Sequence, residues 1–168
     1  MPAETNPPLY PDNSNAALLL GLVLAAPLVS WAAHAMLGLR LDPASWSGTI
    51  RGSMAWLWVL AVAPVVEETI LRSLLQPGLQ HELRRVRLAK PFPLGKHLPG
   101  HGHIANLLTA LVFALLHWPA YGAMALWWVI PSLAIGEVWR RNSSWYQCVL
   151  LHAWFNVSLL GVTAWAER

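Results

Sequence analysis

The sequence predicts an all-α fold, a polytopic membrane helix bundle with about five transmembrane helices. Two features of its composition support this prediction. Of the 168 residues, 56% are hydrophobic and 11% are charged, whereas about a quarter of the residues of a soluble domain are charged. The chain also contains 11 Trp, a residue that is enriched where membrane meets water. So few charges cannot coat a soluble surface, which argues against a cytosolic globular enzyme and against a disordered chain.

The charge balance and the cysteine content narrow the class further. The formal net charge is +3, and the basic residues lie between apolar blocks rather than along one polar face. We therefore expect membrane lipid, and no nucleic acid, as a partner. Cys148 is the single cysteine, which excludes an internal disulfide bond and a metal site built from several cysteines.

Five apolar segments are the candidates for membrane crossing, since a bilayer core requires about 20 apolar residues per helix. We expect these helices at residues 15–39, 53–75, 104–118, 120–139 and 145–165. A polar loop, at about residues 76–103, separates the second from the third. The chain then divides into a short polar N-terminal tail (1–14), a first transmembrane helix with its loop (15–52) and a membrane core (53–168).

The expected turns contain residues that interrupt helices. Pro119 and Gly122 suit a tight turn between the third and fourth helices, and residues 140–144 form the next turn. Pro131 lies within the fourth expected helix, where a proline kinks a helix.

Most loop Lys and Arg residues then fall on one side of the membrane, which places the N-terminus in the cytoplasm by the positive-inside rule.

Few charged residues lie inside the expected helices: Glu67, Glu68 and Arg72 in the second, and Glu137 near the end of the fourth, where we expect it at the membrane interface. A charge at the bilayer centre costs roughly 2.5–3.5 kcal/mol. Glu68 and Arg72 are four residues apart and share a helix face, so we expect an ion pair. Glu67 is rotated by about 100° and is expected to point unpaired into the bundle, where a carboxylate can act as a base. The alternative is one buried structural network of Glu67, Glu68 and Arg72.

Polar side chains in two other helices are candidates for the same site. His117 follows Phe113 by four residues, and His152 precedes Asn156 by four, so each pair shares a face. Two neighbouring donors such as His152 and Asn156 are what an oxyanion site requires. A lone intramembrane histidine is more often an interhelical hydrogen bonder, and we interpret His34 in this way.

Convergence of Glu67, His117, His152 and Asn156 is a hypothesis, because no local argument brings three helices together. At 1.5 Å per residue, Glu67 and His152 lie roughly 11–12 Å from the cytoplasmic side and His117 about 20 Å. The third helix must therefore begin before Ile104, tilt, or sit displaced in the bundle.

The motifs resemble those of the CAAX protease and bacteriocin-processing (CPBP, or ABI) family. Residues 67–72 read EExxxR, residues 113–117 read FxxxH and residues 152–156 read HxxxN, in the family's order. The resemblance implies a glutamic-type intramembrane endopeptidase with a four-helix catalytic core within residues 53–168. It implies that Glu67 activates water with help from His117, and that His152 and Asn156 stabilise the oxyanion. The supporting residues would be Glu68, Arg72 and Phe113.

The motifs also bear on whether the protein requires a metal or another cofactor. No HExxH motif is present and the implied mechanism requires no metal, so we expect no cofactor. Zinc is the alternative, because Glu and His are zinc ligands. A metal site at His97, His101 and His103 is a further alternative, although a solvated loop is the expectation there.

We expect cleavage of a membrane-associated peptide or C-terminal tag in protein sorting or maturation, as in JDVT-CTERM and myxosortase-like systems, in a bacterial cytoplasmic membrane. One alternative is CaaX-type or bacteriocin processing by the same chemistry. Another is a non-enzymatic immunity or scaffold protein. A transporter is disfavoured because no matched repeats appear.

Overall fold

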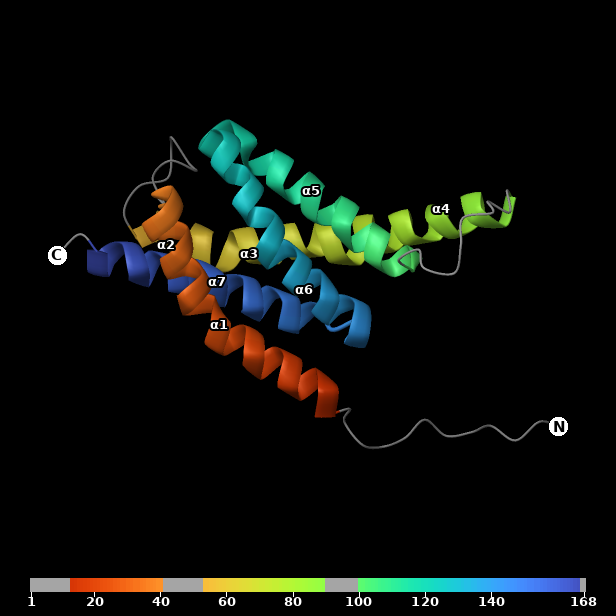
Figure 1. The fold of residues 1–168 in the computed structure, drawn as a ribbon, viewed down its shortest axis with the longest axis horizontal. Helices are drawn as coiled ribbons and strands as arrows, with labels where there is room; N and C mark the ends of the chain where they lie inside the picture. The colour runs from red at the N-terminus through yellow and green to blue at the C-terminus, as the bar shows by residue number, and fades with distance from the viewer. Residues whose placement is uncertain (1–12, 41–52, 90–99, 167–168) are drawn as a thin grey trace.

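The computed structural model describes residues 13–40, 53–89 and 100–166 (Figure 1). Within these ranges the chain is helical except at residues 38–40, 100 and 143–144, and it contains no strand. The all-α prediction is confirmed. Among the described residues, four helical segments are long and apolar enough to cross a membrane: Asn15–Leu37, Met54–Val86, His101–Asn142 and Trp145–Ala166.

The third of these segments is a hairpin, so it contains both the third and the fourth expected helices. Helix α5 (His101–Tyr121) is followed by a 3₁₀ segment, η3 (Gly122–Trp128), and by α6 (Val129–Asn142), which packs back against α5 (Figure 1). The chain reverses at Gly122, whose φ of +56° suits a glycine. The fourth helix therefore begins at Val129 and not near residue 120.

Prolines in this hairpin cause less interruption than expected. Helix α5 continues through Pro119 to Tyr121. Pro131 lies in the first turn of α6, where a missing N–H removes no intrahelical hydrogen bond. Helix α5 also begins three residues before Ile104. An earlier start was one of the three ways in which His117 could reach the depth of Glu67 and His152.

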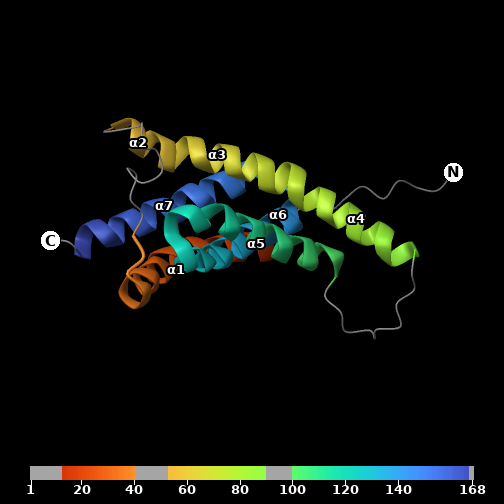
Figure 2. The ribbon, with the colours of Figure 1, turned by 90° about the horizontal axis from the view of Figure 1, so that it is seen from above.

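Residues 53–89 form one continuous helical rod that runs along the bundle and extends past it (Figure 2). The rod comprises α2 (Ser53–Leu57), α3 (Ala63–Glu68) and α4 (Gln76–Ala89), joined by two π-helical stretches, η1 (Trp58–Val62) and η2 (Thr69–Leu75). The expectation of a polar loop from residue 76 is thus wrong for its first half. Its Glu, Gln, Leu and Arg residues are good helix formers, and they extend the membrane helix outward.

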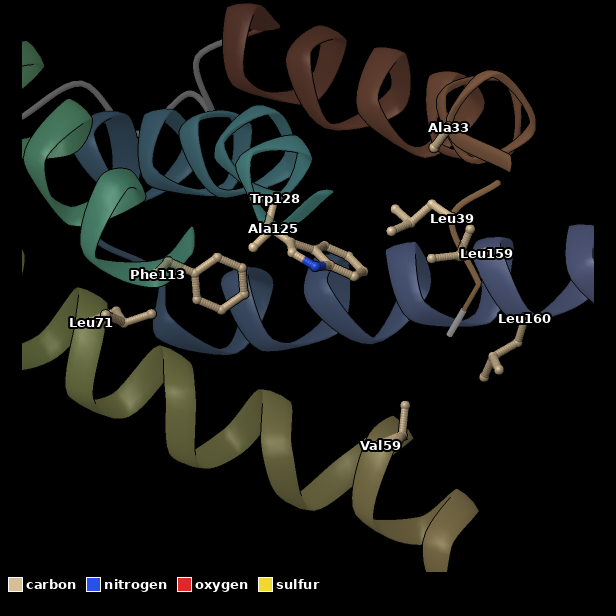
Figure 3. Packing of buried hydrophobic residues seen from close by; sticks show 9 residues of the cluster. All are labelled: Ala33, Leu39, Val59, Leu71, Phe113, Ala125, Trp128, Leu159 and Leu160. Carbon is tan, nitrogen blue, oxygen red and sulfur yellow. The ribbon is translucent and has the colours of Figure 1, made fainter. Parts of the chain in front are cut away.

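Helix α7 (Trp145–Ala166) is the centre of the bundle and contacts α1, α3 and α6. Half of the residues in its most apolar stretch are buried, against 17% for the outer helix α1 (Asn13–Leu37). Figure 3 shows how the buried apolar side chains of the 53–89 rod, α5, η3 and α7 gather around it. Helix α1 approaches through three small buried residues, Ala26, Ser30 and Ala33, which allow close packing in a membrane.

A hydrogen bond to a backbone carbonyl of α1 links this helix to α7. Pro27 has no N–H, so the carbonyl of Val23 one turn earlier lacks its usual intrahelical donor. Trp154 of α7 supplies one, because its Nε1 lies 2.9 Å from the Val23 oxygen. His34 hydrogen-bonds the Leu39 carbonyl at 3.2 Å, just beyond its own helix, so this bond is local rather than interhelical.

Candidate active site

One pocket brings together the four polar residues singled out from three different helices. It has an empty volume of about 300 Å³, its open mouth included, and is lined by Val59, Ala63, Glu67, Phe113, His117, Trp128, His152 and Asn156. Its enclosed cavity has a volume of about 20 Å³, and one water molecule requires roughly 10–15 Å³. The pocket can therefore hold a water molecule against the carboxylate of Glu67.

The two adjacent glutamates occupy opposite surroundings. Glu67 faces the pocket and its side chain is 20% exposed, whereas that of Glu68 is 1% exposed. Glu68 Oε2 accepts a hydrogen bond from Arg72 Nε at 3.0 Å, so the ion pair expected from their spacing is confirmed. Residues 63–68 form a short α-helical turn between two π-helical stretches, and π-turns occur frequently at functional sites.

Arg72 is fully buried and anchors this helix to α6. Its Nη1 donates to Gln76 Oε1 at 2.9 Å, and its Nη2 donates to the carbonyl and the hydroxyl of Ser132, both at 2.7 Å. Gln76 in turn donates to the Gly136 carbonyl. Sequence reasoning missed Gln76 and Ser132. Gln76 had a signal, because it continues the four-residue spacing from Glu68 through Arg72, but nothing local marked Ser132.

His152 stands between the two glutamates. Its Nδ1 lies 2.7 Å from Glu68 Oε1, and its Nε2 lies 3.5 Å from Glu67 Oε2. Because Glu68 is already paired with Arg72, its carboxylate is the acceptor and His152 Nδ1 donates. Glu67 is therefore not isolated, as the sequence suggested, but lies beside the pocket-facing nitrogen of His152.

The FxxxH spacing holds His117 and His152 around one aromatic ring. His117 Nδ1 donates to the Phe113 carbonyl at 2.8 Å, which leaves Nε2 as the nitrogen that can accept a hydrogen bond in the neutral ring. The Phe113 ring lies 4.3 Å from His117 and 5.6 Å from His152, centroid to centroid, with an edge-on contact to His152. Phe113 therefore restricts both imidazoles.

Asn156 is oriented by a backbone carbonyl that a proline leaves without its usual helical donor. In the π-helical stretch, the Ala63 N–H bonds the Trp58 carbonyl, and the next residue, Pro64, has no N–H. The Val59 carbonyl thus lacks both of its local donors, and Asn156 Nδ2 donates to it at 2.9 Å. An amide nitrogen carries two hydrogens, so Asn156 retains a second N–H for the pocket that it lines.

Metal-binding side chains are not grouped in the part of the chain that the structure describes. No set of three or more His, Cys, Asp or Glu there is placed to hold a metal ion. His101 and His103 lie in the first turn of α5. His97, the third residue of the alternative metal site, lies outside the described residues.

A comparison with known families assigns the chain. A family model described as type II CAAX prenyl endopeptidase Rce1-like matches residues 49–158, which is more than half of the chain and includes all three motifs. No curated protein and no solved structure matches the chain. The sequence, the membrane-spanning helices and this match agree: the chain belongs to the Rce1-like family of type II CAAX prenyl endopeptidases, a family of membrane proteases.

Proposed function

We propose that this protein is an intramembrane endopeptidase that cleaves a peptide bond with water activated by Glu67. The observation that carries the proposal is the pocket, where Glu67, His117, His152 and Asn156 face one water-sized space. Family membership supports hydrolysis of peptide bonds, and the pocket supplies a residue for each step of it.

The reaction requires a base, a site for the oxyanion and a proton for the leaving amine. Glu67 accepts a proton from water while the water oxygen attacks the peptide carbonyl carbon. His117 Nε2 helps to hold this water. The carbonyl oxygen becomes an oxyanion, which accepts hydrogen bonds from Asn156 and, in its charged form, from His152 Nε2. Glu67 then returns its proton to the peptide nitrogen, the C–N bond breaks, and a carboxylic acid and an amine leave.

Glu68 and Arg72 support this reaction without touching the substrate. Glu68 binds His152 Nδ1 and so turns Nε2 to the pocket, while Arg72 fixes Glu68. No step requires a metal or a cofactor in this proposal. Zinc remains the alternative to be tested.

The substrate we propose is a membrane-associated peptide, in particular a C-terminal tag with a hydrophobic helix, cleaved in protein sorting or maturation in a bacterial cytoplasmic membrane. The pocket lies among helices that are apolar enough to cross the bilayer, which suits a cleavage site at membrane depth. A CaaX-type substrate follows from the family description and is the competing possibility.

The test reconstitutes the full chain in phosphatidylethanolamine and phosphatidylglycerol vesicles with two probes. One is a farnesylated peptide ending in a CaaX sequence, and the other is a reporter with a hydrophobic C-terminal helix and a basic tail. We expect cleavage of the tagged reporter, a rate lower by about 10²–10⁴-fold for Glu67→Gln, and a normal rate for the matched change Glu82→Gln on exposed α4.

Each result decides between the proposals. Cleavage of the farnesylated peptide alone would replace the sorting substrate by a CaaX substrate. A normal rate for Glu67→Gln would overturn the glutamate mechanism, and no cleavage of either probe by the wild-type chain would overturn the proposed function.

A further inference from the structure

A second, more apolar lobe adjoins the pocket, and Trp128 is one of the four residues that line both. The second lobe has an empty volume of about 200 Å³. It shares Phe113, Trp128, His152 and Asn156 with the first lobe and is completed by Pro131, Ser132, Ile135 and Phe155. A peptide that occupies both lobes therefore contacts the Trp128 side chain.

The indole N–H of Trp128 is a buried donor to which no described residue offers an acceptor. The residue is 6% exposed, and its Nε1 atom has no hydrogen-bond partner among the described residues. Two other indoles of the bundle are satisfied, since Trp145 donates to Thr69 and Trp154 donates to Val23. Buried donors are nearly always paired in native proteins, so this exception requires an explanation.

The ring of Trp128 is held in place by two aromatic neighbours. Its centroid lies 5.5 Å from that of His117 and 5.8 Å from that of Tyr121. In Figure 3 the nitrogen lies on the ring edge nearer Phe113, which also lines both lobes. A donor fixed in this way loses little side-chain freedom when it binds an acceptor, which favours a recognition role.

We propose that Trp128 is a substrate-binding residue whose indole N–H donates to a backbone carbonyl of the peptide, next to the carbonyl that is cleaved. Every peptide residue offers such an acceptor, and the oxyanion itself is assigned to His152 and Asn156. This inference rests on the proposed function, because it needs a peptide in the pocket. It explains why an indole, and not another large apolar side chain, lines both lobes.

The experiment compares Trp128→Phe with wild type and with a matched change in the same 3₁₀ segment, Trp127→Phe, whose side chain lines neither lobe. The probe is whichever of the two substrates the wild-type chain cleaves. Removal of one hydrogen bond is expected to lower kcat/KM about 3- to 10-fold for Trp128→Phe, with no change for Trp127→Phe. A benzothienylalanine at position 128 keeps the ring size, removes the N–H, and should give the same loss.

A second measurement separates binding from a merely structural role. Each peptide carbonyl flanking the scissile one is replaced in turn by a methylene group. One replacement should slow the wild-type chain about 3- to 10-fold and leave the Trp128→Phe variant unaffected, because the partner has already been removed. Equal losses in both chains at every position, or an unchanged rate for the benzothienylalanine protein, would overturn the proposal. No cleavage by wild type would instead count against the proposed function.

Discussion

Replacement of Glu68 by Gln is expected to destabilise the bundle strongly, although the two side chains have nearly the same shape. Glu68 accepts one hydrogen bond from Arg72 at 3.0 Å and one from His152 at 2.7 Å, each on a different oxygen. A glutamine has one acceptor oxygen, so its NH₂ group must face one of these donors. The buried guanidinium of Arg72 also loses its counter-charge. Removal of one partner from a buried ion pair costs about 3–5 kcal/mol.

Thermal unfolding of the detergent-solubilised variants, followed by Trp fluorescence, measures this effect. A loss of 3–5 kcal/mol corresponds to a fall in Tm on the order of 10 °C for a chain of this size. The matched control is Glu67→Gln, one residue away. Its carboxylate faces the pocket, so its Tm should stay within about 2 °C of wild type.

A double variant identifies the cause. Glu68→Gln combined with Arg72→Met removes the uncompensated charge and should recover part of the lost Tm. An unchanged Tm for Glu68→Gln alone would refute the reasoning, as would an equal loss for Glu67→Gln.

Three further outcomes are expected. Gly136→Ala places a Cβ atom into the amide of Asn106 and should abolish the folded peak in size-exclusion chromatography. Gly161→Ala, whose Cβ would meet no atom within 4 Å beyond its own stretch of helix, should elute as wild type does. Trp154→Phe removes the bond to the Val23 carbonyl and should lower Tm by about 2–4 °C, as expected for roughly 1 kcal/mol. A strong zinc chelator should leave cleavage by the purified chain intact, and complete loss of cleavage would support the zinc alternative.

The parts of this protein that the sequence predicts are those determined by local geometry. Apolar length alone finds the membrane-crossing segments, although not where each helix ends, and helix periodicity alone pairs Glu68 with Arg72. The same periodicity separates Glu67 from them by a rotation about the helix axis. The all-α fold and the ion pair were therefore predictable from local geometry, whereas the start of α5 before Ile104 was only one of three possibilities that the expected depth of His117 left open.

The parts that could not be predicted depend on contacts between distant segments. Ser132 binds Arg72 across 60 residues of sequence, and Trp128 belongs to the pocket only because η3 folds back over α5. Residues 76–89 have the polarity of a loop, yet they remain helical as a continuation of the rod. The position of His152 between two glutamates likewise depends on how α7 packs against α3.

One turn of helix gives two identical carboxylates different environments, and the surrounding sequence maintains the difference. Glu68 points to the bundle interior, where Arg72 compensates its charge, while Glu67 points to a space that holds water. His152 touches both, so the structural carboxylate sets the orientation of an imidazole that serves the pocket-facing one. Because the two glutamates act through the same ring, substitution of Glu68 should impair stability and cleavage together, whereas substitution of Glu67 should impair cleavage alone. A bundle this small can therefore keep a buried charge for structure without neutralising the one that the proposed chemistry requires.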